Sequence, residues 1–461
     1  MSFPLMTGLS RKWESLLADL SAPPSGPRFL PVLWVALPLL LLAAGTGFVR
    51  LTDFDFSFQK AIYQAGGNSW ALGDHPFWNA LYRFGTLLPA FVILGSMIGL
   101  ILGFSRDRFR KWRKVFLFCI LLAITGPGVI TNGLLKEYWG RPRPRHVEEL
   151  GGHEKFEPIL TIDRTSKGKS FPCGHATMGF YFLGGFFLFR RNRRKLAEGF
   201  LIFGLITGGV IGVARMAQGG HFFSDVIWAA AVCYFTAMGL YYLLRLDRGL
   251  TLSPGSEKPM PRIAKVGSAL AGAVMLGGIL VATPYRDERD FELLNDYAKE
   301  GDLRIHLTLT VGEADLVPSD DFTVTGKAYG HGVPTSQIAI NYLEYDLEDL
   351  TYVIFQERMS GWFFEVDEQL QVRIPWDRTR ELWLQPDRSE SWLTLPESPR
   401  DTTLRIMKGE GEIHLDTNGQ SILFGDGPRP DPSTVRITID DDFTGSLFVD
   451  GEKHPPNGEG E

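Results

Sequence analysis

The sequence predicts an α-helical polytopic membrane protein, with a six-helix core and a seventh span, followed by a β-rich exported domain. Two observations predict this fold class. Long apolar runs without charge occur only before residue 285, and the net charge changes sign at the same place. Residues 1–284 carry 31 basic and 16 acidic side chains, a net charge of +15, whereas residues 285–461 carry 16 and 37, a net charge of −21. This division indicates two different environments.

The composition excludes several other classes of protein. Aromatic residues make up 12% of the chain, which excludes collagen-like, fibrous and wholly disordered proteins. There are 3 cysteines, none of them after Cys233, and this excludes a disulfide scaffold and a four-cysteine zinc site.

Five apolar runs are long enough to cross the hydrocarbon core of a bilayer, which takes roughly 20 residues. They are residues 30–49, 86–104, 115–135, 226–244 and 266–284. Two shorter runs, 176–189 and 199–214, lie between these and are flanked by charge, so we expect them to span as well. The first run begins too far into the chain, and is too long, for the apolar region of a cleaved signal peptide.

The distribution of Lys and Arg predicts the orientation. Basic residues are concentrated in segments 1–29, 105–114, 190–195 and 245–265, which the spans place on one side, and this side should be the cytoplasm. The N-terminus is then cytoplasmic and residues 285–461 lie outside. The sequence has no N-x-S/T acceptor, so we expect a bacterial inner (plasma) membrane with this domain in the periplasm. One outer loop, 136–175, holds eight bases against the rule.

The predicted domain organisation follows from these spans. It comprises a cytoplasmic tail at 1–29, a membrane core at 30–245, a cytoplasmic linker and seventh span at 246–284, an acidic β-rich domain at 285–452 and a disordered tail at 453–461. Period-two alternation at 303–311, 338–342 and 435–439 predicts strands, compatible with either a sandwich or a short stacked β-solenoid. The aromatic segment 50–85 is compatible with a hairpin over the site entrance or with simple headgroup anchoring.

Three polar clusters lie at the outer ends of the predicted spans. The first follows the third span and contains Lys136 and Arg143 among prolines. Arginine offers a planar fork to phosphate and lysine a point charge, so the cluster is a candidate anion site, although a basic patch at the lipid headgroups is the alternative. In the second cluster, Cys173 and Gly174 form a turn before His175. The glycine and the following helix start favour an anion close to the backbone.

The third cluster contains Arg215, His221 and Asp225. His221 and Asp225 are four residues apart, which places them on one face of a helix. A carboxylate bonded to one ring nitrogen selects a tautomer and leaves the other nitrogen free to attack. Two histidines and an aspartate could also bind zinc, but the neighbouring bases would repel a cation, and we therefore expect no metal.

The three motifs, in this order and spacing, resemble the signature of the type 2 phosphatidic acid phosphatase family, which includes lipid phosphate phosphatases and belongs with the vanadium haloperoxidases. The matching residues are Lys136-x6-Arg143-Pro144, Pro172-x-Gly174-His175 and Arg215-x5-His221-x3-Asp225. The resemblance covers about residues 30–245. The chain departs from the family at Cys173 and Ala214, where the family usually has serine. The Cys173 thiol is a poorer hydrogen-bond donor to phosphate than a hydroxyl.

The resemblance implies a role for each matching residue. Lys136, Arg143, Arg215 and the backbone of Gly174, with Cys173 beside them, would bind the phosphate of the substrate. His221 would be the nucleophile, oriented by Asp225, and His175 would protonate the leaving group, without any cofactor.

The expected function is therefore hydrolysis of a lipid phosphomonoester or diphosphate at the periplasmic face through a phosphohistidine. The resemblance implies undecaprenyl diphosphate, phosphatidylglycerol phosphate, phosphatidic acid or lipid A as candidate substrates. The expected partners are this lipid and the bilayer, and we expect no nucleic-acid partner. The alternatives are a lipid phosphotransferase, or a non-enzymatic membrane anchor or transporter for the β-rich domain. No protein partner of that domain is predicted.

Overall fold

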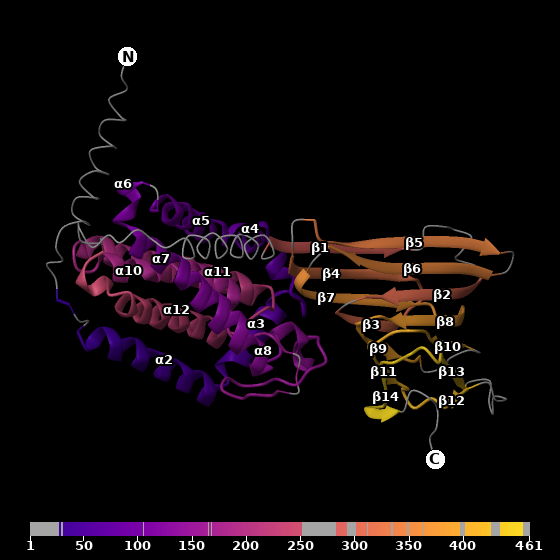
Figure 1. Cartoon of the computed structure of the whole chain (residues 1–461). Helices are drawn as coiled ribbons and strands as arrows, with labels where there is room; N and C mark the ends of the chain where they lie inside the picture. Colours follow the sequence, from indigo (N-terminus) through magenta and orange to yellow (C-terminus); the bar gives the residue numbers. More distant parts are fainter. Residues whose placement is uncertain are drawn as a thin grey trace. The chain divides into compact units, whose positions relative to one another are not determined.

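The computed structural model describes residues 27–28, 31–104, 106–164, 166, 168–250, 283–292, 301–310, 312–332, 335–347, 350–361, 363–396, 402–425 and 434–454. The chain divides into two compact units, Met1–Leu276 and Gly277–Glu461. Figure 1 shows a helical unit and a β unit, coloured along the sequence. The predicted seventh span lies outside the described residues except for its last two positions, which already belong to the first strand.

The described part of the first unit is helical. Its longer helices are α2 (Leu33–Thr52), α3 (Phe54–Ala65), α4 (Pro76–Phe84), α5 (Leu87–Leu102), α7 (Arg113–Ala123), the π-helix η2 (Ile124–Leu135), α11 (Arg194–Ala217) and α12 (Phe223–Leu243). Shorter helices are η1 (Ala71–Asp74), α6 (Asp107–Arg110), α8 (Lys136–Trp139), η3 (Pro144–His146), η4 (Glu148–Leu150), α9 (Gly174–Phe180), α10 (Leu183–Phe189) and η5 (Leu246–Arg248).

Among the described residues, 5 helical stretches are long and apolar enough to cross a membrane. They are Leu33–Thr52, Pro76–Leu102, Arg113–Trp139, Arg194–Ala217 and Phe223–Leu243, and they correspond to five of the seven predicted spans. The predicted span 176–189 differs. It is divided into α9 and α10, each of 7 residues, and most of its side chains are buried among the other helices. The division makes each piece too short to cross a bilayer by itself.

Segment 50–85 contributes buried polar side chains to the helical unit. It forms α3, η1 and α4, and polar residues of α3 point inward: Asp55 and Gln59 are buried, with at most 1% of their surface exposed. Because these two residues are four apart, they share one face of α3. Asp55 contacts Arg141 and Ser224, and Gln59 contacts His221, as described below.

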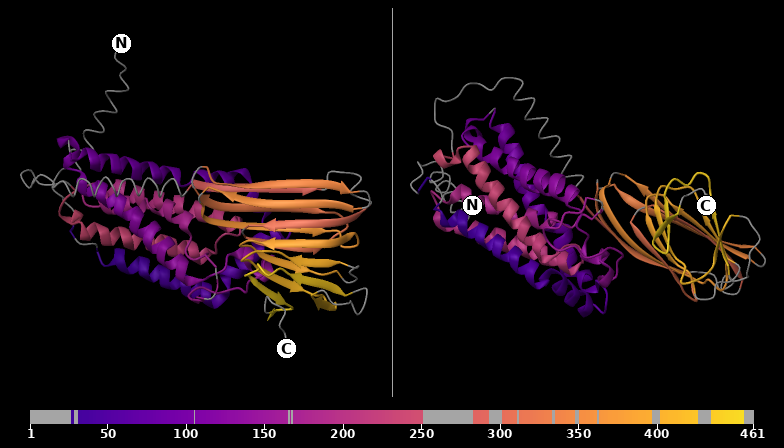
Figure 2. Two further views of the ribbon diagram at one scale, coloured as in Figure 1. Left: turned by 45° about the vertical axis from the view of Figure 1, so that its right-hand side comes forward. Right: turned by 90° about the horizontal axis from the view of Figure 1, so that it is seen from below.

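The second unit consists of two sheets, drawn in orange to yellow in Figure 1 and visible as two layers in Figure 2. One sheet has 8 strands in the order β1-β4-β7-β3-β9-β11-β14-β15, and the other has 7 in the order β12-β13-β10-β8-β2-β6-β5. The strands are β1 (Thr283–Glu292), β2 (Asp302–Leu309), β3 (Glu313–Pro318), β4 (Thr323–Gly332), β5 (Gln337–Leu347), β6 (Leu350–Ser360), β7 (Phe363–Ile374), β8 (Thr379–Pro386), β9 (Glu390–Thr394), β10 (Thr403–Ile406), β11 (Glu412–Asp416), β12 (Ile422–Phe424), β13 (Val435–Ile439), β14 (Ser446–Val449) and β15 (Glu452–His454).

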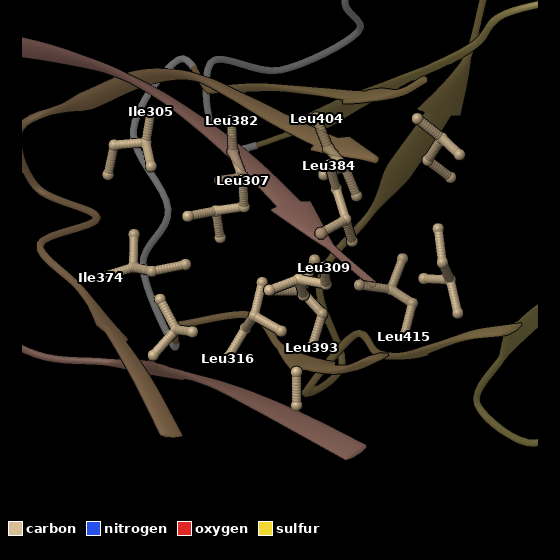
Figure 3. Close-up of a cluster of buried hydrophobic side chains, with 14 of the residues drawn as sticks. Ile305, Leu307, Leu309, Leu316, Ile374, Leu382, Leu384, Leu393, Leu404 and Leu415 are labelled. Atoms are coloured by element: carbon tan, nitrogen blue, oxygen red, sulfur yellow. The ribbon is translucent and has the colours of Figure 1, made fainter. Parts of the chain in front are cut away.

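The pairing identifies this unit as a short β-solenoid. Strand pairs β2–β3, β6–β7, β8–β9, β10–β11 and β13–β14 each pass from one sheet to the other, and equivalent strands of successive pairs are parallel. Alternating side chains point inward and form a leucine-rich core between the sheets, which includes Leu307, Leu316 and Leu393 (Figure 3). Antiparallel strands flank the parallel stack, with β1, β4 and β5 at one end and β15 at the other.

Two predicted boundaries of the β-rich domain need correction. Strand β1 begins at Thr283, before the expected start at residue 285, because backbone pairing with β4 begins there. Lys453 and His454, which were expected to be disordered, form β15 and pair with β14. In both places hydrogen bonds to a neighbouring strand order residues whose local composition is typical of a linker or tail.

Candidate active site

The ionisable residues of the three motifs come from different helices and connecting loops of the first unit and are all buried. Lys136 opens α8 directly after η2, His175 lies in the first turn of α9, and Arg215 lies in the last turn of α11. Arg143, His221 and Asp225 complete the set, and each of the six exposes at most 7% of its surface. Charged and polar side chains are rarely buried together unless they are paired or bind a ligand.

His221 is held in one orientation. Its Nδ1 lies 2.6 Å from the carbonyl oxygen of Ser170, and because a carbonyl can only accept, Nδ1 carries the proton. Nε2 is then the unprotonated nitrogen. The pKa of His221 is lowered to about 3, mainly by burial; Asp225 opposes this shift, and the charge of Arg215 adds to it. The imidazole is therefore neutral at physiological pH, with its lone pair on Nε2.

Asp225 lies beside His221, but the predicted direct hydrogen bond between them is not formed. The Asp225 Oδ2 atom is 3.6 Å from His221 Nδ1, which is an ion-pair distance and too long for a hydrogen bond. The carboxylate instead accepts from the Ser170 hydroxyl at 2.6 Å and from the backbone N–H of Phe222 at 2.8 Å. Asp225 thus caps the start of α12, and the Ser170 carbonyl selects the tautomer of His221.

His175 is packed against a tyrosine from outside the motifs. The rings of Tyr82 and His175 are stacked, with centroids 4.8 Å apart and an interplanar angle of 26°. The guanidinium carbon of Arg215 lies 4.9 Å from the centroid of the same Tyr82 ring. Tyr82 lies in α4 and is 1% exposed. Tyr82 therefore contacts residues of both the second and the third motif. Nothing in the sequence distinguishes it from the other aromatic residues of segment 50–85.

The basic residues of the motifs repel one another. Burial lowers the pKa of Arg143 well below its usual value, and the nearby charges of Arg145 and Arg215 lower it further. Arg215 donates through Nη1 to the side-chain oxygen of Gln218 at 2.7 Å, and its Nε has no hydrogen-bond partner among the described residues. The charge of Lys136 also lowers the pKa of His221, as that of Arg215 does. Like charges in a buried site favour the binding of an anion, since an anion offsets their repulsion.

The turn at Cys173 and Gly174 is closely packed. A β-carbon on Gly174 would lie 2.9 Å from the side-chain oxygen of Asn132, so only glycine fits without displacing Asn132. Cys173 is fully buried, and its backbone N–H donates to the carbonyl of Asp225 at 3.2 Å. Burial raises the pKa of the Cys173 thiol to about 11, although Arg215 and Lys136 act in the opposite direction. The thiol is therefore protonated at neutral pH and is a poor nucleophile.

We expect the substitution Cys173→Ser to strengthen substrate binding, because a hydroxyl is a better donor to phosphate than a thiol. A net hydrogen bond of about 1 kcal/mol corresponds to roughly a fivefold decrease in KM. The measurement is the KM for phosphate release by the wild type and the variant. If the thiol were the nucleophile, the substitution would instead abolish turnover.

Several residues that complete the site were not identified from the sequence. They are Asp55, Gln59, Tyr82, Arg141 and Ser170, all of them nearly or fully buried. Two of them carried a usable signal, because Arg141 lies inside the first motif and Ser170 begins the second cluster. The other three, Asp55, Gln59 and Tyr82, are ordinary residues whose partners are distant in the sequence.

The bundle of apolar helices and the buried bases around a neutral, oriented histidine define a membrane-bound phosphatase. A family model described as "PAP2 superfamily" matches residues 114–248. The chain is 32% identical over 199 residues to a protein named lipid A 4'-phosphatase from Francisella tularensis subsp. novicida (strain U112), covering 43% of this chain and 89% of that protein. This chain belongs to the PAP2 superfamily, as its motifs predicted, and it is a multi-pass membrane enzyme, a lipid phosphatase.

The chain is also similar to one further curated relative and to two solved structures. A lipid A 4'-phosphatase from Rhizobium leguminosarum is 30% identical over 139 residues, 29% of this chain and 56% of that protein. A PAP2-type phosphatidylglycerolphosphate phosphatase structure from Bacillus subtilis is 22% identical, with a TM-score of 0.28, over 47% of this chain and 94% of that one. A structure of a putative cell adhesion protein from Clostridium sporogenes ATCC 15579 is 9% identical, with a TM-score of 0.23, over 36% of this chain and 98% of that one.

Proposed function

We propose that this lipid phosphatase hydrolyses a phosphate ester on the headgroup of lipid A through a phosphohistidine on His221, without a metal ion. The observation that carries the mechanism is the geometry of His221: Nδ1 faces the Ser170 carbonyl at 2.6 Å, so that Nε2 keeps its lone pair. Relatives named lipid A 4'-phosphatase support the choice of lipid over the other candidate substrates.

In the first step, the lone pair of His221 Nε2 attacks phosphorus and the bond from phosphorus to the headgroup oxygen breaks. His175, in its protonated form, gives its proton to the departing oxygen, so that the dephosphorylated lipid leaves as an alcohol. The phosphoryl group is now on Nε2 and the ring is positively charged. Asp225, with Oδ2 3.6 Å from Nδ1, stabilises that charge, and Nδ1–H continues to donate to Ser170.

In the second step, a water molecule attacks phosphorus and gives a proton to His175, which is neutral after the first step. The bond from phosphorus to Nε2 breaks, inorganic phosphate leaves, and His221 returns to its neutral form. Lys136, Arg143, Arg215 and the backbone N–H of Gly174 bind the phosphoryl oxygens in both steps. Phosphoryl transfer depends mainly on positioning and charge stabilisation, which fixed cations can supply in place of a metal.

The proposed location is the inner membrane of a bacterium, with the N-terminus in the cytoplasm and the active site and β-solenoid in the periplasm. The distribution of Lys and Arg supports this orientation, since the segments 105–114 and 190–195 are strongly basic. The proposed organisation retains the tail 1–29 and the phosphatase core 30–245, and the linker with the seventh span now ends before β1, at 246–282. The exported domain is that of residues 285–452, extended at both ends by the strand residues noted above.

Phosphate release by the purified full-length protein in detergent tests this proposal. The substrates are lipid A, phosphatidylglycerol phosphate, phosphatidic acid and undecaprenyl diphosphate, each assayed with and without EDTA. We expect the highest kcat/KM with lipid A, no effect of EDTA, and inhibition by vanadate. Preference for another lipid would overturn the substrate, loss of activity in EDTA with recovery on adding a divalent metal would overturn the metal-free mechanism, and turnover only with an acceptor lipid would indicate a phosphotransferase.

A further inference from the structure

Arg141 lies in the sequence between two proposed phosphate ligands, Lys136 and Arg143, but its guanidinium serves different partners. It is fully buried, with 0% of its surface exposed. One terminal nitrogen donates to Asp225 Oδ1 at 2.6 Å, and the other donates to Asp55 Oδ2 at 2.8 Å. A guanidinium with its donors directed at two carboxylates is not available to bind the phosphate of a substrate.

The remaining contacts of Arg141 enclose it on all sides. Its Nε donates to the backbone oxygen of Glu157 at 3.0 Å, and Nη1, the nitrogen bonded to Asp225, also donates to the Ser224 hydroxyl at 2.8 Å. Its guanidinium carbon lies 4.2 Å from the centroid of the Phe222 ring. The backbone oxygen of Arg141 accepts from Ser170 N–H at 2.9 Å. Arg141 is thus bonded both to Asp225 and to Ser170, the two residues that border His221 Nδ1.

Helix α3 also contacts the segment that carries His221. Asp55 accepts from the backbone N–H of Ser224 at 2.9 Å and from the Ser224 hydroxyl. One turn later, Gln59 donates to the backbone oxygen of His221 at 2.7 Å. The segment from His221 to Ser224 is therefore held at both ends by one face of α3. Asp55 also supplies Arg141 with a second negative charge, so that the guanidinium is held between two carboxylates.

The two oxygens of Asp225 are consequently divided between two tasks. Oδ1 accepts from Arg141, whereas Oδ2 accepts from Ser170 and Phe222 and lies next to the His221 ring. Because Arg141 holds Oδ1 at 2.6 Å, the plane of the carboxylate is determined, and Oδ2 is placed where positive charge develops on the ring during attack.

We propose that Arg141, held by Asp55, is a positioning residue for phosphoryl transfer, which orients Asp225 and the His221 loop without contacting the phosphate. This inference rests on the proposed role of His221 as nucleophile. It assigns α3, which lies outside the three motifs, to the support of the chemical step.

The test is a comparison of kcat, KM and inhibition by inorganic phosphate across matched variants of the full-length enzyme. We expect Arg141→Lys, which keeps the charge but loses the fork, to lower kcat by about 10- to 100-fold, as outer partners of active-site histidines do. KM and the inhibition constant of inorganic phosphate should stay within about twofold, because uniform binding is unchanged. Arg143→Lys should instead raise both the KM and the inhibition constant of inorganic phosphate.

A double-variant cycle adds a second readout. Arg141→Gln leaves Asp55 and Asp225 as two buried carboxylates without their shared cation, and we expect it to be more impaired than the other variants of this cycle. Adding Asp55→Asn removes one of those charges, so the double variant should recover part of the lost kcat. Arg194→Gln, which breaks the exposed Arg194–Glu198 pair at 2.8 Å, is the matched control for charge loss and should behave as the wild type.

Each outcome separates this inference from the proposed function. If Arg141→Lys weakens phosphate inhibition as strongly as Arg143→Lys, Arg141 is a phosphate ligand and the inference is wrong. If kcat is unchanged in a variant that retains the thermal unfolding midpoint of the wild type, it is also wrong. A fall in kcat that parallels a loss of folded protein, with no recovery in the double variant, would overturn it too. In all three cases an inactive His221→Ala would leave the proposed nucleophile in place.

Discussion

His221→Ala is expected to lower kcat for phosphate release by about 10⁴- to 10⁶-fold, the range found when an essential nucleophile is removed. The physical reason is that His221 combines a neutral ring, an Nδ1–H directed at the Ser170 carbonyl at 2.6 Å, and a position among the buried bases. Alanine removes the attacking nitrogen and leaves the bases in place, so that substrate binding should be retained while the covalent step is lost.

The direct measurement is the amount of phosphorylated enzyme trapped after rapid denaturation at alkaline pH, where phosphohistidine survives. Wild-type protein should carry phosphate on a histidine during turnover, and His221→Ala should carry none. The control is Arg194→Gln, which changes an exposed side chain of α11 and should be phosphorylated normally. An alanine variant that inserts into membranes and retains full activity would exclude His221 as the nucleophile.

His175→Asn should produce the second largest loss, and the size of that loss should depend on the leaving group. General acid catalysis contributes about 10²- to 10⁴-fold when the leaving group is a poor one, such as the alkoxide of a lipid headgroup. An aryl phosphate with an acidic phenol leaves without a proton, so the first step should hardly change with that substrate. Asparagine is a neutral planar side chain that can still lie against Tyr82, which stacks on the His175 ring at 4.8 Å.

The two steps can be separated by rapid mixing. With p-nitrophenyl phosphate, the variant should release a normal initial burst of nitrophenol and then turn over slowly, because the water attack also needs His175. With the lipid substrate the burst itself should be lost. Equal slowing of the burst with both substrates would show that His175 binds phosphate or supports the fold and does not act as the acid.

The helical spans and the motif residues could be predicted because their signals are local. A run such as Leu33–Thr52 is apolar over a length that only a bilayer or a large core requires, and the predicted run 30–49 overlaps it closely. The run at 176–189 shows the limit of that argument. It has the composition of a span, but α9 and α10 are separated at Tyr181 and Phe182, and burial against other helices explains their apolar side chains equally well.

The β unit shows the same limit. Alternation at 303–311 predicted a strand facing a core, but it could not distinguish a sandwich from a solenoid, since both bury every second residue. The distinction depends on which strands pair. Strand β2 lies between β6 and β8, both parallel to it, and these partners lie tens of residues away in the chain.

The sequence by itself determined the class of protein, because nine motif residues and the apolar spans occur at characteristic spacings. Only the tertiary structure decided which groups hold His221, the proposed nucleophile. Ser170 supplies its carbonyl to His221 Nδ1, Arg141 and Asp55 hold Asp225, and Tyr82 packs on His175. The physical reason is that these contacts join residues 51 to 93 positions apart, and hydrogen bonds and ring contacts over such separations leave no periodicity in the sequence.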